Sequence, residues 1–151
     1  MIDVAEFKRS SKLLIYDSRH YLYCVYRGPG DWTNPNTISL IGADGDTLDG
    51  VLRRVREKFN LVTETGDWSV TGKAENPADN EINTIWTFGI PIDSLIFLPS
   101  AYGGLLCLKP STLWLFERML SPAVISIMRA IPHLFEERRG GAVRSSSARY
   151  F

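Results

Sequence analysis

The sequence has few cysteines, few histidines, no net charge and no long uncharged apolar run. Two cysteines in 151 residues are too few for a disulfide-dense secreted scaffold. Cys24 and Cys107 lie in apolar stretches, which favours buried free thiols and leaves a disulfide between them as the alternative. His20 and His133 have no Cys or His neighbour at ligand spacing, so we do not expect a zinc site.

The charge pattern also excludes several classes of protein. A formal net charge of zero gives no bulk attraction to nucleic acid or to a membrane. Residues 1–10 lack the apolar segment of a signal peptide, and no uncharged apolar stretch is long enough to cross a bilayer. We therefore expect an intracellular, cytoplasmic protein without membrane contact.

The composition predicts one globular domain followed by a basic tail. The chain is 44% hydrophobic and 23% charged, which is typical of a domain with a real core. We place this domain at residues 1–137. Residues 138–151 contain four arginines and no acidic residue, and residues 140–147 favour flexibility. Four charges support at most a weak, salt-sensitive contact with nucleic acid.

Strand and helix signals alternate along the chain and predict an α+β fold. Lys12–Tyr16 and Tyr21–Arg27 favour a β-hairpin because a short polar segment separates them. Further strands are expected at residues 37–41, 68–71, 82–92 and 95–98, with a polar loop at 72–81. Helices are expected at residues 47–60, at 112–120 with Ser111 as cap, and from Ser121 to a point before Pro132.

The helix predicted at residues 47–60 has the clearest pattern. Apolar residues recur every three or four positions and give one buried stripe: Leu48, Val51, Leu52, Val55 and Phe59. Thr47 is a predicted N-terminal cap, and Asn60 is a predicted C-terminal stop.

Gly45–Thr47 lies directly before the predicted helix, and Arg53–Leu61 covers its second half and its exit. These segments, together with the element order over roughly residues 12–120, resemble the signature of the Nudix hydrolases. In that family, Gly-Glu-Thr precedes a helix that carries Arg-Glu and then Glu-Glu. Here Gly45–Thr47 resembles the first part, and Arg53–Leu61 resembles the helix and its exit. Trp32 and Pro35 resemble the Trp and Pro that commonly precede the signature, and Lys109–Thr112 resembles the start of the C-terminal helix.

The sequence departs from the signature where the family has glutamates. If Arg53 occupies the arginine position, then Arg54, Glu57 and Lys58 occupy the glutamate positions. If Arg54 occupies it instead, Val55 occupies a glutamate position. Asn60 replaces the usual glycine in either case, and no register keeps more than about two acidic ligands.

The resemblance implies a magnesium-dependent pyrophosphohydrolase, whose carboxylates hold the metal that activates water. If the chain is active, the candidate Mg²⁺ ligands are Asp46, Asp49 and Glu57, with Glu57 as the catalytic residue. Acidic residues of the turns near positions 44 and 75–81 could supply further ligands. The alternative is an exposed ladder of ion pairs formed by Asp49, Arg53 and Glu57, which are spaced four residues apart.

A cationic helix face could instead bind phosphate directly, because arginine offers a bidentate fork. The candidate ligand-binding residues are Arg27, Trp32, Arg53 and Arg54. The alternatives are a solvated helix face and a Trp32 that anchors its loop.

Residues 113–135 contain more apolar side chains than one buried helix stripe requires. They predict either a contact with a protein partner or second copy, or a helix pair folded back on the sheet. Three hypotheses remain. The first is a Nudix-like domain that binds a nucleotide-type or phosphorylated ligand, or a protein partner, with weak or lost hydrolysis. The second is an active hydrolase with a rearranged metal site. The third is an assembly component that docks through its C-terminal helices.

Overall fold

Six strands form one mixed β-sheet in the order β4-β5-β1-β3-β2-β6. The computed structural model describes residues 7–30, 34–59, 61–96 and 103–136. The strands are β1 (Lys8–Leu14), β2 (Leu22–Arg27), β3 (Thr37–Asp44), β4 (Trp68–Asn76), β5 (Glu81–Phe88) and β6 (Gly103–Leu108). β1 runs parallel to β5, whereas the other neighbouring strands are antiparallel.

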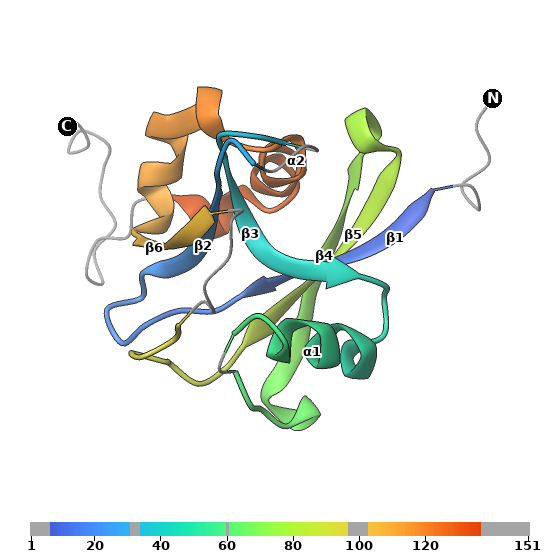
Figure 1. Ribbon diagram of the computed structural model, residues 1–151, viewed down its shortest axis with the longest axis vertical. Helices are drawn as coiled ribbons and strands as arrows, with labels where there is room; N and C mark the ends of the chain where they lie inside the picture. The colour runs from blue at the N-terminus through green and yellow to red at the C-terminus, as the bar shows by residue number, and fades with distance from the viewer. Residues whose placement is uncertain (1–6, 31–33, 60, 97–102, 137–151) are drawn as a thin grey trace.

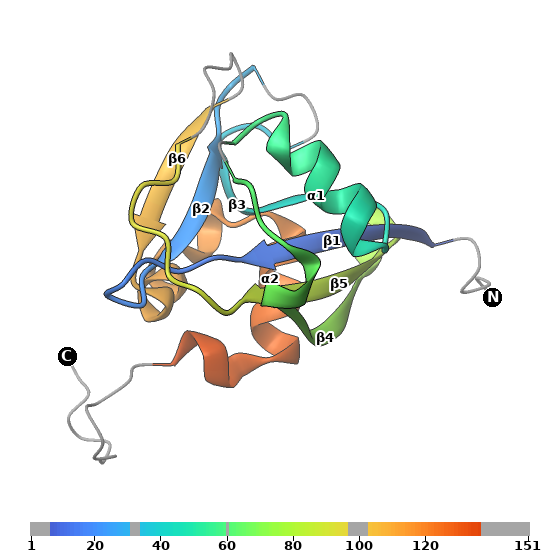
Figure 2. The same ribbon diagram turned by 90° about the horizontal axis from the view of Figure 1, so that it is seen from below.

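Helices cover both faces of this sheet, which confirms the predicted α+β class. Helix α1 (Leu48–Arg56) lies on one face and α2 (Pro122–Ala130) on the other (Figures 1 and 2). Four 3₁₀ helices complete the described part: η2 (Thr65–Asp67), η3 (Pro77–Asp79), η4 (Pro110–Met119) and η5 (Pro132–Phe135). Among the described helices, none has the length and hydropathy needed to cross a bilayer.

The central strand β1 serves two cores, one on each face. Leu13 lies in a cluster with α1, and Leu14 lies in the cluster on the α2 side. Successive side chains of a strand point to opposite faces, so a strand covered on both sides becomes a continuous apolar run. The α1-side cluster includes Ile15, Ile41, Val51, Val55 and Phe59, and the α2-side cluster includes Ile85, Leu113, Val124, Ile127 and Phe135.

The predicted hairpin forms only at its turn. Tyr16 and Leu22 make a single antiparallel bridge beside the turn at residues 17–20. Beyond it the two strands diverge, and β3 pairs with both of them: Leu13 lies opposite Ile41, and Cys24 lies opposite Leu40. The polar turn was readable from sequence, but the insertion of a third strand depends on pairings distant in the chain.

Several predicted boundaries were wrong. Much of the expected loop at 72–81 is strand, because β4 continues to Asn76 after a bulge between Val70 and Gly72. Leu95 and Ile96 are not in a strand, and residues 97–98 lie outside the described part. β6 was not predicted, and the expected helix at 112–120 is the 3₁₀ helix η4, which starts at Pro110, so Ser111 is not its cap.

Candidate functional site

Helix α1 is stabilised because its apolar side packs against one face of the sheet. Val51, Leu52 and Val55 are buried against the α1-side cluster, and each such side chain contributes roughly 1.5–3 kcal/mol. Thr47 is the N-cap residue of α1, as predicted, and has an extended backbone, but its hydroxyl makes no capping hydrogen bond. The helix ends at Arg56 with Glu57 as its C-cap, and Asn60, the predicted stop, lies outside the described residues.

The turn between β3 and α1 is fixed by backbone contacts. Gly45 has φ +106°, a conformation that favours glycine. Its N–H donates to the carbonyl of Arg9 (2.9 Å), and its carbonyl accepts from Ser11 Oγ (2.8 Å). The Gly45–Thr47 segment that resembles the family signature therefore holds the start of α1 against β1.

Arg54 completes this turn from the helix side. Its Nη1 donates to the carbonyl of Asp44 (3.0 Å) and to that of Gly50 (3.3 Å). A Cβ added at Gly45 or Gly50 would lie 3.4 Å from the same nitrogen, which is about van der Waals contact, so the guanidinium packs closely over both glycines. The hydrogen bonds of Arg54 thus connect helix α1 to the preceding turn, so in this structure Arg54 positions the helix relative to the turn.

The candidate metal ligands do not converge. Asp46, Asp49 and Glu57 are all exposed. Within the described residues, the ion pairs are Lys8–Asp44, Lys8–Glu81 and Arg19–Asp17, so the predicted Asp49–Arg53–Glu57 ladder is absent. Exposed pairs are worth little, so nothing forces these flexible side chains together.

The residues present therefore do not fit a magnesium ion. Over the described ranges, no three His, Cys, Asp or Glu side chains are grouped closely enough to hold a metal. Mg²⁺ prefers an octahedral shell of oxygen atoms. The exposed face of α1 instead carries Arg53, Arg54 and Arg56, whose charges oppose the binding of a divalent cation.

The acidic residues of the turns do not supply the missing ligands. Glu81 is buried at the start of β5, where its Oε1 accepts from Asn83 Nδ2 (3.1 Å) and Asn76 Nδ2 (3.4 Å). Asp79 accepts from Asn76 Nδ2 (2.9 Å). Both carboxylates therefore accept hydrogen bonds that stabilise the connection between β4 and β5.

Lys12 is a buried cation that sequence reasoning missed. Its side chain is on the α2 side of β1, and the residue is only 7% exposed. Burial lowers the pKa of Lys12, Glu81 opposes this shift, and Arg27 adds to it. The signal in the sequence was its alternation with Leu14 on one face of the strand. Arg27, a predicted ligand-binding residue, is half-buried, and its charge is one of the causes that lower the pKa of Lys12. Trp32, another predicted ligand-binding residue, lies outside the described residues.

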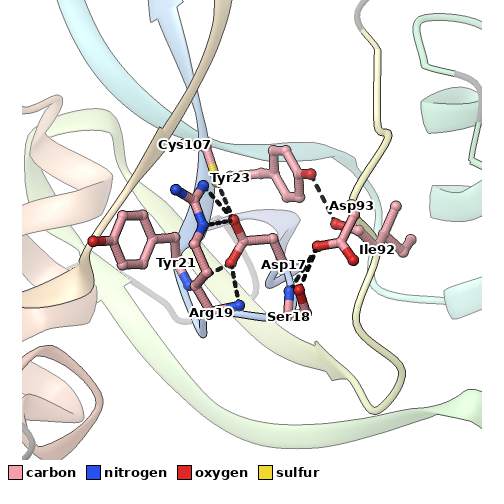
Figure 3. A network of polar contacts seen from close by, with 8 residues as sticks. All are labelled: Asp17, Ser18, Arg19, Tyr21, Tyr23, Ile92, Asp93 and Cys107. Atoms are coloured by element: carbon pink, nitrogen blue, oxygen red, sulfur yellow. Dashed lines mark hydrogen bonds and ion pairs between the residues drawn. The ribbon is translucent and has the colours of Figure 1, made fainter.

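A network of polar contacts lies around Asp17, in the turn between β1 and β2 (Figure 3). Its Oδ1 accepts from the backbone N–H groups of Arg19 and Tyr21, each at 2.9 Å. Its Oδ2 accepts from Arg19 Nε (2.8 Å), Arg19 Nη2 (2.6 Å) and Cys107 Sγ (3.5 Å). Burial alone would raise the pKa of Asp17, but these hydrogen bonds lower it below its ordinary value.

Both cysteines are free thiols, as expected from the sequence. Burial raises the pKa of the Cys24 thiol to about 12, and burial together with the bond to Asp17 raises that of Cys107 to about 11. The thiolate is the nucleophilic form of cysteine, so neither residue is an activated nucleophile.

Solved structures share this architecture. A protein from Deinococcus radiodurans is 18% identical, with a TM-score of 0.65 and 82% coverage of each chain. A MutT protein from Methanosarcina mazei is 16% identical, with a TM-score of 0.64 over 85% of this chain and 92% of its own. The Nudix domain of NrtR from Shewanella oneidensis, solved with ADP ribose, is 11% identical, with a TM-score of 0.60 over 84% of this chain and 87% of its own.

Neither a family model nor a curated protein matches the sequence. The structural similarity establishes the fold: the chain has a Nudix-like fold. In this particular protein, α1 follows the Gly45–Thr47 turn that resembles the family signature, and the exposed face of α1 carries Arg53, Arg54 and Arg56.

Proposed function

We propose that this chain binds a nucleotide-type or other phosphorylated ligand on the α1 side of the sheet, with weak or lost hydrolysis. The supporting observation is that α1 carries Arg53, Arg54 and Arg56 in its last turns, whereas the nearby carboxylates do not converge. Arginine binds phosphate through a planar fork of N–H donors. The ligand would then be held by charge, without a metal.

Arg53 is the better candidate for direct ligand contact. It is exposed on α1 and makes no ion pair within the described residues, whereas Arg54 is bonded to two backbone carbonyls. Arg27 and Trp32 remain proposed ligand contacts from the sequence.

ADP ribose, the compound bound to the Shewanella oneidensis domain, is a suitable probe. Calorimetry in the presence of EDTA should detect metal-independent binding, and Arg53→Ala should weaken it at least tenfold, or about 1.4 kcal/mol. Arg129→Ala is the matched control, because Arg129 is exposed on α2, on the other face of the sheet. Equal affinities of both variants and the unchanged protein would contradict the proposal.

An active Mg²⁺-dependent pyrophosphohydrolase is the second candidate. It is favoured by the Nudix-like fold and by the exposure of Asp46, Asp49 and Glu57, which leaves these carboxylates of α1 and its two ends accessible. A screen of nucleoside diphosphate derivatives with Mg²⁺ or Mn²⁺ tests it. Turnover that disappears in a folded Glu57→Gln variant would establish this candidate over the first.

Docking through residues 113–135 is a third candidate. Part of this segment is core, since Leu113, Val124 and Ile127 are buried. Its η4 portion nevertheless exposes Leu115 (80%), Met119 (40%) and Phe116 (38%). Leu115→Glu should abolish a complex formed through this surface and leave the melting temperature unchanged; an undiminished complex excludes this surface.

A further inference from the structure

The sheet has two edge strands, and they are protected very differently. An edge strand presents a row of unpaired N–H and C=O groups that can pair with another chain. β4 has a bulge between Val70 and Gly72 and exposes Lys73 and Glu75. Bulges and charged side chains are features that discourage edge pairing, so the β4 edge is protected.

The β6 edge has none of these features. Gly103–Leu108 reads Gly-Gly-Leu-Leu-Cys-Leu, without charge or proline. It pairs with β2 in an uninterrupted register from Leu22–Leu108 to Arg27–Gly103. All six residues are half-buried. β6 lies beside β2 at one edge of the sheet (Figure 1).

The hydrogen-bond pattern identifies which groups point outward. The N–H of Tyr23 donates to the carbonyl of Ile15, away from β6. Tyr23 lies opposite Cys107, so this pair exchanges no backbone bonds and the N–H of Cys107 points away from β2. The same alternation directs the N–H of Leu105 outward and that of Leu106 toward β2. Within the part of the chain that the structure describes, no hydrogen bond reaches the outward N–H groups of Leu105 and Cys107.

We propose that β6 pairs with β6 of a second copy of this chain, antiparallel about a two-fold axis, so that the two sheets become continuous. The residues whose backbone groups point outward, Gly103, Leu105 and Cys107, are centred on Leu105, so their full overlap places the two Leu105 residues opposite each other. Their outward N–H and C=O groups then satisfy one another, as in any antiparallel ladder.

Charge favours this occupant and this direction. The strand is uncharged, so self-pairing brings no like charges together, and the formal net charge of zero removes bulk repulsion between copies. Lys109 follows the strand directly. Antiparallel pairing places the two Lys109 side chains at opposite ends of the ladder, whereas parallel pairing would place them side by side.

Light scattering on the full chain tests the proposal. The unchanged protein should have the mass of a dimer, and Leu105→Pro should reduce it to a monomer, because proline removes the outward N–H and leaves the bonds of Leu106 to β2. Gly104→Ala is the control: an added Cβ meets nothing within 4 Å, so its mass should stay that of the dimer. A monomeric unchanged protein at its highest soluble concentration, or a folded Leu105→Pro variant that is still a dimer, overturns the proposal.

Amide hydrogen exchange on the unchanged protein keeps the test valid if Leu105→Pro does not fold. The amides of Leu105 and Cys107 should exchange slowly in concentrated protein and at least tenfold faster on dilution to monomer. The amide of Leu106 should be protected in both samples, since it bonds to β2. Fast exchange of the Leu105 and Cys107 amides at every concentration contradicts edge pairing.

Discussion

Two turns of this molecule each have several charged residues nearby, but hydrogen bonds hold a carboxylate in one turn and a guanidinium in the other. In the turn between β1 and β2, one buried carboxylate, Asp17, accepts hydrogen bonds from two backbone N–H groups, a guanidinium and a thiol. At the turn between β3 and α1, Asp46 and the neighbouring Asp49 in the first turn of α1 are exposed, and the charge held by hydrogen bonds is the guanidinium of Arg54. The first turn is organised by an anion and the second by a cation.

The difference shows why charge alone is a poor guide to a metal site. A carboxylate becomes a useful ligand when the fold fixes its position, and the fold fixes Asp17 rather than Asp46 or Asp49. The donors around Asp17 all come from the protein, so this carboxylate stabilises a turn. The β3–α1 turn contains the Gly45–Thr47 segment that resembles the family signature, whereas the exposed face of the helix that follows carries arginines.

The largest expected effect is at Asp17. Asp17→Asn replaces one acceptor oxygen by an NH₂ group that faces donors, so we expect a loss of roughly 1–3 kcal/mol in the free energy of unfolding. The side chain of Arg19 is 63% exposed, so water screens its part of this loss. Urea denaturation measures the change. Asp93→Asn is the matched control, because exposed Asp93 binds only Ser18 among the described residues, and a loss as large as that of Asp17→Asn would contradict the assignment.

The unchanged protein and the Asp17→Asn variant should differ in how their free energies of unfolding depend on acid pH. The pKa of Asp17 is lowered in the folded state, so its contribution is complete above the ordinary carboxyl pKa of roughly 4 and is lost as the pH falls through the folded value. The stability difference between the unchanged protein and Asp17→Asn should therefore be constant near neutral pH and shrink in acid. A difference that grows in acid would mean that the folded pKa is raised.

A smaller effect is expected at Arg54, and it separates the two arginines of α1. Arg54→Ala removes the bonds to the Asp44 and Gly50 carbonyls and should cost about 1 kcal/mol. Arg53→Ala should stay within about 0.5 kcal/mol, because it removes an exposed side chain without such contacts. Thermal melting of both variants checks this, and equal losses would show that Arg54 does not fasten the turn.

Local patterns predicted the elements of this fold better than their arrangement. The apolar stripe of α1, the stop of α2 before Pro132 and the polar turn at residues 17–20 all depend on neighbours in sequence. The position of β3 between β1 and β2 depends on pairings such as Leu13 with Ile41, which the local pattern does not encode. β6 was missed because its Gly-Gly start is atypical of a strand and only its pairing with β2 makes it one.

In the candidate site, too, the sequence predicted local features better than the contacts between distant residues. The Gly45–Thr47 turn and the cationic residues of α1 were readable from the resemblance and the composition. The bonds of Arg54, the burial of Lys12 and the separation of Glu81 from α1 were not, because each depends on where a long side chain lies after folding. The absence of the predicted Asp49–Arg53–Glu57 ladder among the described ion pairs has the same cause.

The smallest expected effect is that of Mg²⁺ on the melting temperature. It tests whether the exposed carboxylates at the β3–α1 turn differ from the hydrogen-bonded Asp17 in having no fixed position. A ligand that binds only the folded state raises its stability by mass action. Because the described carboxylates near α1 do not group around a common point, added Mg²⁺ should leave the melting temperature unchanged, and Glu57→Gln should change the free energy of unfolding by less than about 0.5 kcal/mol. Thermal melting with Mg²⁺, with EDTA and with NaCl at equal ionic strength separates specific binding from screening. A rise in melting temperature with Mg²⁺ alone that disappears in Glu57→Gln would mean that the exposed carboxylates rearrange around the ion, and the β3–α1 turn would then be a metal site after all.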